Sequence, residues 1–283
     1  MAGFNHLAAH ATVVPMEFLN KRAEERLRGV RLFLLDMDGT FSIGPHMIPG
    51  ADRFLARARE TGCGVLFLTN NSSGDASGYA ARFAAMGVDV PAADILTSGA
   101  ATAQILAGEG VRRVYLLGTP SLEEEFRRAG LALTATDPEM VVLGFDRTLT
   151  YEKLMTGCTL LRRGLPFVAT NPDINCPTPQ GPIPDAGSFM AAIEASTGRG
   201  PDRVIGKPNP EFLRGAMALR GVSSGETAMV GDRLYTDVAS GNAAGVLSIL
   251  VLSGESVRGM LDKSPHRPDV VAPCLGTLVP YLD

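Results

Sequence analysis

Two aspartates directly after an apolar run are the first residues in this sequence whose types and spacing could do chemistry. The sequence DMDGT begins at Asp36 and follows the run Leu32–Leu35. In open α/β sheets, ligands bind beyond the carboxyl ends of the strands, where carboxylates are costly to bury unless a cation or a reaction uses them. The spacing lets Asp36 act on a reacting centre while Asp38 reaches a neighbouring group. A strand-ending turn or a calcium loop is the alternative, although no later acidic ligands of a calcium loop follow.

Three further clusters have residue types that suit phosphate or a metal ion. The sequence TNNSS begins at Thr69 after an apolar run, and a hydroxyl followed by backbone N–H groups suits an anion. Lys207 stands between a glycine and a proline and offers a point charge for phosphate. Asp232 and Asp237 belong to the sequence GDRLYTD and supply carboxylates of the kind that Mg²⁺ binds. Taken alone, each cluster could instead be a turn, a solvated lysine or a helix cap.

The elements that must position these clusters alternate between short apolar runs and amphipathic stretches. This alternation is typical of an α/β fold with a doubly wound parallel sheet. We expect strands at Leu32–Leu35, Val65–Leu68, Val114–Leu117, Val141–Leu143, Phe167–Ala169, Ala228–Val230 and Leu247–Val251. We expect helices at Ala51–Glu60, Tyr79–Met86, Ala100–Ala107, Leu122–Ala129, Glu152–Arg163, Ser188–Thr197, Pro210–Leu219 and Asp237–Ala244. Thr150, Pro210 and Thr236 are suited to helix starts, and the proline-rich segment Asn171–Pro184 predicts a structured loop.

Composition narrows the class of protein. Hydrophobic residues make up 45% and charged residues 20% of 283 residues, which allows a sizeable core. The net charge of −4 argues against a general nucleic-acid binder. The four cysteines form no CxxC pair, so neither a zinc site nor a disulfide framework is indicated. Without a signal peptide or a bilayer-spanning apolar run, the sequence predicts a cytoplasmic protein with no membrane partner.

Together, the four clusters resemble the haloacid dehalogenase-like (HAD) hydrolase superfamily, whose pattern is DxDGT, hydroxyl-Asn, a loop Lys and GDxxxTD. The segments VLGFDRTLTY, ATNP, IGKPNP and GDRLYTDV are similar to subclass IIA, the NagD-like, p-nitrophenylphosphatase-type branch. The resemblance runs from about Gly29 to the C-terminus. It implies a Rossmann-like HAD core of residues 30–110 and 201–283, a smaller C2-type α/β cap domain of residues 111–200, and an N-terminal extension of residues 1–29.

The resemblance also implies roles for the carboxylates. Asp36 would be the nucleophile that forms an aspartyl-phosphate, and Asp38 would protonate the leaving oxygen and then activate water. Mg²⁺ would be held by Asp36, by the backbone carbonyl of Asp38 and by Asp232. Asp237 would support the metal site from outside the ligand set, by holding a metal-bound water or orienting the loop.

The transferring phosphoryl group would be bound by a second set of residues. By the resemblance, this set is Thr69, the region of Asn70 and Asn71, and Lys207. The sequence departs from the family pattern after TNNSS, where Gly74 and Asp75 stand in place of the basic residue that many relatives carry. This departure argues against a substrate that relies on a second cation at that point, such as one with two phosphates or a carboxylate.

In the expected cap, the segment Asn171–Pro184 is the candidate for the part that faces substrate. Its polar residues Asn171, Asp173 and Asn175 are the candidates for selecting the leaving group. The sequence thus predicts a Mg²⁺-dependent phosphatase acting on a small phosphorylated metabolite. A phosphomutase on the same scaffold stays open, and so do the substrate and a homo-oligomer. A catalytically silent binding or regulatory protein is the remaining alternative, against which the presence of Asp38, Lys207 and Asp232 argues.

Overall fold

The computed structural model describes residues 19–178 and 180–282 and contains a six-stranded sheet in the order β15-β14-β13-β1-β4-β5. All neighbouring strands in it run parallel. Its strands are β1 (Leu32–Asp36), β4 (Gly64–Thr69), β5 (Ile95–Thr97), β13 (Thr227–Gly231), β14 (Leu247–Val251) and β15 (Val270–Ala272). Because β1 lies between β13 and β4, the carboxyl ends of these three strands meet at one edge.

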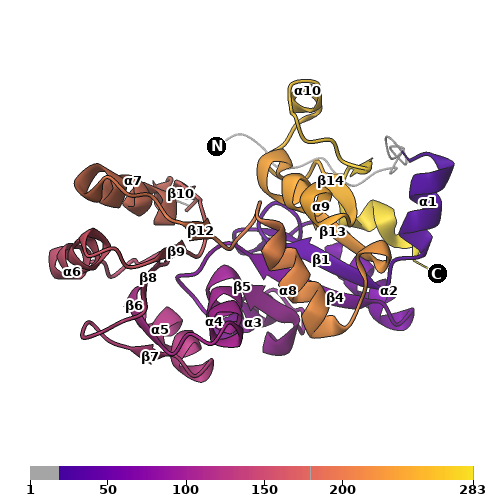
Figure 1. Cartoon of the computed structure of the whole chain (residues 1–283). Helices are drawn as coiled ribbons and strands as arrows, with labels where there is room; N and C mark the ends of the chain where they lie inside the picture. The colour runs from indigo at the N-terminus through magenta and orange to yellow at the C-terminus, as the bar shows by residue number, and fades with distance from the viewer. Residues whose placement is uncertain (1–18, 179, 283) are drawn as a thin grey trace.

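A second, five-stranded parallel sheet has the order β12-β9-β8-β6-β7. Its strands are β6 (Arg113–Leu117), β7 (Ala132–Leu133), β8 (Met140–Leu143), β9 (Phe167–Ala169) and β12 (Arg203–Val204). With helices α5, α6 and α7 it forms the left part of the molecule in Figure 1, which we call the second sheet unit. Strand β12 lies beyond residue 200, so the second sheet continues past the predicted limit of the cap; the domain boundaries themselves stay a prediction.

Helices surround both sheets. The second sheet unit contains α5 (Pro120–Arg128), α6 (Tyr151–Arg162) and α7 (Ala186–Thr197). The other helices are α1 (Lys21–Arg28), α2 (Ala51–Glu60), α3 (Ala76–Ala85), α4 (Ser98–Gly108), α8 (Pro210–Arg220), α9 (Ala239–Ala244) and α10 (Arg258–Leu261). Within the described ranges, none of the helices is long and apolar enough to cross a membrane. The predicted doubly wound α/β fold is confirmed.

Local sequence explains most helix starts. Thr150 accepts a hydrogen bond from Lys153 N and caps α6, and Pro210 is the first residue of α8, both as predicted. The prediction for Thr236 is wrong, because a π-helical turn at Leu234–Val238 precedes α9. The side chain of Asp237 bends back to accept from Arg233 N at 3.1 Å, which wraps this turn around its carboxylate.

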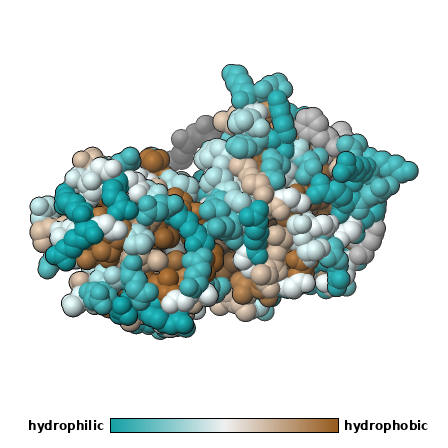
Figure 2. All heavy atoms as spheres, in the orientation of Figure 1, coloured by the Kyte–Doolittle hydropathy of each residue, from teal (hydrophilic) through white to brown (hydrophobic). Residues whose placement is uncertain are grey.

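The first sheet is buried on both faces, as expected for a parallel sheet. Successive residues of β1 point to opposite sides: Phe33 and Leu35 join one apolar cluster, while Leu32 and Leu34 join another. The second cluster continues into α5 of the second sheet unit. On the face seen in Figure 2, hydrophilic residues cover much of the surface, and hydrophobic residues are visible chiefly over the left part, which is the second sheet unit.

Two short antiparallel pairs sit near the site described below. One pair is β2 (Ser42–Ile43) with β3 (His46–Met47). The other is β10 (Asn175–Cys176) with β11 (Ile183–Pro184), so the predicted loop contains a hairpin. Residues 1–18 of the predicted N-terminal extension lie outside the described residues.

Candidate active site

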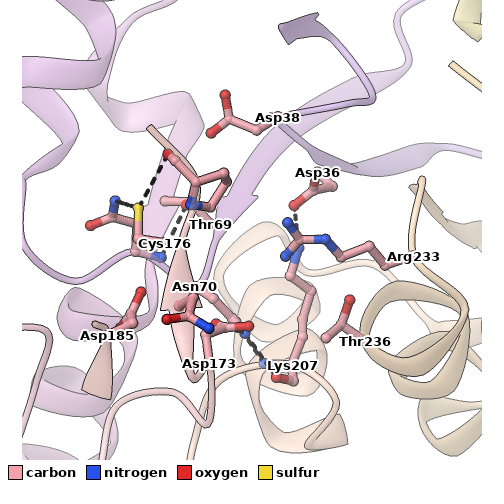
Figure 3. A pocket seen from close by; sticks show the side chains of 13 residues that line it. Asp36, Asp38, Thr69, Asn70, Asp173, Cys176, Asp185, Lys207, Arg233 and Thr236 are labelled. Carbon is pink, nitrogen blue, oxygen red and sulfur yellow. Dashed lines mark hydrogen bonds and ion pairs between the residues drawn. The ribbon is translucent and has the colours of Figure 1, made fainter. Parts of the chain in front are cut away.

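Four segments that are distant in sequence enclose a pocket at the carboxyl edge of the first sheet. Asp36 ends β1, Thr69 ends β4, Asp232 follows β13, and Lys207 lies in the loop after β12. The pocket has a volume of about 70 Å³ (Figure 3). Its lining residues are Asp36, Asp38, Thr69, Asn70, Asn71, Asp173, Asn175, Cys176, Pro177, Asp185, Lys207, Arg233 and Thr236.

Lys207 is buried between two carboxylates. Its Nζ lies 2.5 Å from Asp36 Oδ1 and 2.8 Å from Asp237 Oδ1, and its side chain is 3% exposed. Burial opposes the charged ammonium, yet the negative charges of Asp237 and Asp36 outweigh it and raise the pKa of Lys207. Lys207 is therefore a fixed cation at the base of the pocket, and Figure 3 shows it pointing toward Asp36.

Three carboxylates crowd around this single ammonium group. Asp36, Asp232 and Asp237 offer oxygens that all lie within 4.8 Å of one another. Burial raises the pKa of Asp36 well above its usual value, against the opposing charge of Lys207. Burial, followed by the charge of Asp237, raises the pKa of Asp232 to about 6. The cluster thus brings three carboxyl groups together beside the ammonium group of Lys207.

The carboxylate of Asp232 shows where a cation would fit. Its Oδ2 accepts from Glu255 N at 2.6 Å, but its buried Oδ1 has no hydrogen-bond partner in the described part of the chain. A Cβ at Gly39 or at Gly254 would overlap this carboxylate, and Gly39 has a φ of +89°. The DxDG glycine therefore leaves room for Asp232 beside the Asp36 turn. An unpartnered oxygen among clustered carboxylates fits a hard divalent cation such as Mg²⁺.

The first residues of the TNNSS segment line the pocket, and Ser72 contacts the second sheet unit. Thr69 and Asn71 line the pocket, and Thr69 Oγ1 accepts from Asn71 N at 3.1 Å. The side chain of Ser72 is buried; its Oγ accepts from Phe145 N at 2.8 Å and lies 2.8 Å from Thr170 Oγ1. The second half of the motif therefore joins the two sheets.

The side chain of Asn70 positions its neighbours. Its Oδ1 accepts from Lys207 N at 2.9 Å, and its Nδ2 donates to Lys207 O at 2.9 Å and to Asp173 Oδ2 at 2.8 Å. This side-chain amide fixes the backbone of Lys207. It also contacts Asp173 in the segment Asn171–Pro184, which we call the substrate loop. A contact from Asn70 to phosphate would therefore come from its backbone.

Of the three cap residues predicted to face substrate, two line the pocket and one does not. Asp173 and Asn175 line the pocket, whereas Asn171 is fully buried and is absent from the pocket lining. Asn171 Nδ2 donates to Asp185 Oδ1 at 3.0 Å and to Asp173 Oδ2 at 3.2 Å. Asn171 thus orients two carboxylates that do reach the pocket. Burial raises the pKa of Asp185 to about 6, against the opposing hydrogen bond from Asn171.

Sequence reasoning missed Asp185, Arg233 and Arg82. Arg233 was visible within the sequence GDRLYTD, and its Nε lies 2.8 Å from Glu255 Oε2. Arg82 lies on the amphipathic helix α3, where no local pattern marks it, and its Nη2 donates to Asp38 Oδ1 at 2.5 Å.

A larger cavity of about 570 Å³ adjoins the pocket. Asp173, Asn175, Pro177, Arg233 and Thr236 line both spaces. Tyr235 and Glu255 add further polar groups to the cavity, and Tyr235 OH donates to Glu255 Oε1 at 2.9 Å. Prolines and Ile174 make up much of the remaining lining of the cavity. A ligand anchored beside Asp36 would extend into this cavity.

Comparison with known proteins agrees with this geometry. A haloacid dehalogenase-like hydrolase model matches residues 33–132, and a HAD-hydrolase-like model matches residues 204–278. Dihydroxyacetone phosphatase of Corynebacterium glutamicum is 40% identical over 89% of this chain and 91% of its own length. Ribonucleotide monophosphatase NagD of Escherichia coli is 34% identical over 88% of this chain and 98% of its own.

A solved structure has the same fold over most of the chain. The crystal structure of 4-nitrophenylphosphatase from Thermotoga maritima has a TM-score of 0.87 and 48% identity, covering 90% of this chain and 98% of that one. The chain therefore belongs to the haloacid dehalogenase-like hydrolase family, in its NagD-like branch, as the sequence motifs predicted.

Proposed function

We propose that this protein is a Mg²⁺-dependent phosphatase that hydrolyses phosphate monoesters of small metabolites through an aspartyl-phosphate on Asp36. One observation carries the proposal: Asp36 and the buried Lys207 face each other at 2.5 Å inside a pocket that also contains Asp38 and Thr69. In the proposed reaction, these residues would supply a nucleophile, a fixed cation and an acid–base group around one small space. The phosphatase names of the relatives support the same class of reaction.

The reaction follows from the roles of these groups. A carboxylate oxygen of Asp36 attacks phosphorus, and the bond from phosphorus to the ester oxygen breaks. Asp38 donates its proton to that leaving oxygen, a contribution of ~10²–10⁴ in rate. Asp38 then takes a proton from water, whose oxygen attacks phosphorus and breaks the bond to Asp36. Inorganic phosphate leaves, and the Asp36 carboxylate is restored.

Positioning and charge stabilisation complete the site, as in phosphoryl transfer generally. Lys207, the Thr69 hydroxyl and the backbone amides near Asn70 and Asn71 would bind the non-bridging oxygens. The metal ion would be held by Asp36, the Asp38 carbonyl and Asp232, with Asp237 supporting them. When bound, Mg²⁺ would neutralise charge on the phosphoryl oxygens and favour the ionised form of Asp36.

We propose that the second sheet unit is the cap and that the adjoining cavity receives the leaving group. Acceptors on Asp173, Asn175 and Glu255 and donors on Arg233 and Tyr235 line its walls. Such a mixed lining suits a small polyhydroxylated leaving group. The relative named dihydroxyacetone phosphatase is consistent with a substrate of this size.

Hydrolysis of p-nitrophenyl phosphate, followed with Mg²⁺, with EDTA, and after restoring Mg²⁺, tests the proposal. We expect activity to be lost with EDTA and to return with Mg²⁺. Quenched turnover should place a phosphate adduct on the peptide that contains Asp36. Restoration by zinc but not by magnesium would refute the metal assignment, and an adduct on another residue would refute the nucleophile.

The metal site has a separate test that needs no turnover. Binding of Mg²⁺ at 100 times its Kd should stabilise the folded protein by ~2.7 kcal/mol, measured by thermal unfolding. Asp232→Asn should abolish this shift, whereas Asp52→Asn, on the exposed side of α2, should keep it. A full shift in Asp232→Asn would place the metal elsewhere.

A further inference from the structure

Arg82 connects helix α3 to the turn that carries Asp38. Its Nη2 donates to Asp38 Oδ1 at 2.5 Å, and Gly44 O at 2.9 Å and Ser42 Oγ at 3.1 Å lie within reach of the same nitrogen. Ser42 begins β2, and Gly44 lies in the turn to β3. One guanidinium group thus holds both the aspartate and the hairpin that follows it.

The carboxylate of Asp38 depends on this contact. Its side chain is 50% exposed, and no other side chain within residues 19–178 and 180–282 makes a hydrogen bond to it. Figure 3 shows Asp38 lying apart from the Asp36–Lys207 pair. An exposed aspartate would otherwise sample several rotamers. The planar guanidinium loses little freedom on binding a carboxylate, so it restricts Asp38 at low entropic cost.

Arg82 lies on helix α3, and the start of this helix is fixed by a cap. Asp75 caps α3 by accepting from Gly78 N at 2.8 Å, which fixes the start of the helix directly after the TNNSS segment. Arg82 is absent from the residues that line the pocket. It therefore acts on the reaction through Asp38, without touching the phosphoryl group.

We propose that Arg82 is a positioning residue that keeps the Asp38 carboxylate where the leaving-group oxygen of the ester must be protonated. This inference rests on the proposed function, in which Asp38 is the general acid. The consequence depends on the leaving group. Phenolate needs the proton as its bond to phosphorus breaks, whereas p-nitrophenolate is a stable anion and needs it far less.

The test compares phenyl phosphate with p-nitrophenyl phosphate, two substrates of nearly the same shape. Arg82→Met should lower kcat/KM for phenyl phosphate ~10–100-fold, a part of the general-acid contribution, and for p-nitrophenyl phosphate by less than ~10-fold. The ratio kcat/KM is compared because it reports the transfer to Asp36 and leaves out the later hydrolysis, which is common to both esters. Arg82→Lys should recover part of the loss, because a cation is retained. Arg220→Met is the matched control: Arg220 Nη2 pairs with Asp94 at 2.7 Å, at a similar exposure of 33%, away from the pocket.

Asp38→Asn separates failure of this inference from failure of the proposed function. We expect Asp38→Asn to favour p-nitrophenyl phosphate over phenyl phosphate, and Arg82→Met to add no further bias in that background. Equal losses of kcat/KM for both esters in Arg82→Met, or no loss, would overturn the positioning role while a biased Asp38→Asn left the function intact. An unbiased Asp38→Asn would refute the acid role of Asp38, and the inference with it.

Discussion

Two of the regions in which this protein buries carboxyl groups compensate for them differently. In the pocket, Asp36 and Asp237 share the ammonium group of Lys207. In the packing of α5 against α4, Glu125 is buried with a hydroxyl as its hydrogen-bond donor: Thr97 Oγ1 donates to it at 3.0 Å. Burial raises the pKa of Glu125 to about 7, against the opposing hydrogen bond from Thr97.

This difference distinguishes the carboxyl groups of the pocket from the carboxyl group of Glu125, which is buried in helix packing. Burial of a carboxylate favours its neutral form, and this is the direction in which burial shifts the pKa of Glu125. In the pocket, Lys207 opposes the burial that raises the pKa of Asp36, and in the proposed function this opposition favours the ionised carboxylate that attacks phosphorus. Each prediction below tests one side of this contrast, beginning with the largest expected effect.

Asp36→Asn should abolish turnover, with a loss of ~10⁴–10⁶ in kcat, because the nucleophile is removed while the other groups stay. The measurement is hydrolysis of p-nitrophenyl phosphate by the purified variant, with folding checked by circular dichroism. Asp52→Asn, at an exposed position of α2, is the control and should keep full activity. Near-normal activity in folded Asp36→Asn would mean that the aspartyl-phosphate mechanism is wrong.

Lys207→Met should destabilise the protein by ~3–5 kcal/mol in the absence of divalent cations, because it leaves buried carboxylates unpaired. Chemical denaturation measures the loss, and activity should vanish with it. Lys153→Met is the matched control, since Lys153 Nζ pairs with the buried Asp146 at 2.8 Å outside the pocket. That variant should lose stability and retain its chemistry. Unchanged stability of Lys207→Met would show that the ammonium group does not compensate for the cluster.

Glu125→Gln should stabilise the protein at neutral and alkaline pH, the opposite of the effect expected for Lys207→Met. The carboxyl keeps its proton to about pH 7 in the folded state but ionises near pH 4.5 when unfolded, so the folded state binds more protons between these values. Stability that is present below pH 4.5 is therefore lost as pH rises to about 7, by ~3 kcal/mol. Denaturation of Glu125→Gln across this range should lack that loss and show the higher stability at pH 8.

The exposed Glu60, with its side chain 66% accessible, supplies the control for this experiment. Glu60→Gln should keep the pH dependence of the parent protein. A parent whose stability did not fall between pH 4.5 and 7 would contradict the protonated state assigned to Glu125.

Substitutions in the substrate loop should have the smallest effects. Asn175→Ala and Asp173→Ala remove polar groups from the adjoining cavity, and Asn171→Ala releases the carboxylates of Asp173 and Asp185. We expect ~10-fold changes in the ratio of kcat/KM between phosphate esters of different alcohols. p-Nitrophenyl phosphate should be hydrolysed nearly as before. A uniform fall across all esters would place substrate selection elsewhere.

The sequence by itself determined the strands that are apolar and bounded by turns. β1, β8, β9 and β14 lie where their apolar runs predicted, and Thr150 and Pro210 begin their helices as expected. These features depend on neighbours within a few residues, so a local pattern carries them. Strands β5 and β15, each of three residues, were not predicted, although β9 has the same length and was.

Only the tertiary structure decided which side chains meet. Asp36 and Lys207 are 171 residues apart, Asn70 and Asp173 are 103 apart, and Asp38 and Arg82 are 44 apart. Motif resemblance placed Asp36, Asp38 and Lys207 in one predicted site, but it gave no sign of Arg82 and did not distinguish buried Asn171 from Asp173 in the pocket. Such contacts exist because β1 is inserted between β13 and β4 and because the second sheet unit packs over that edge. No local pattern of residues encodes that order.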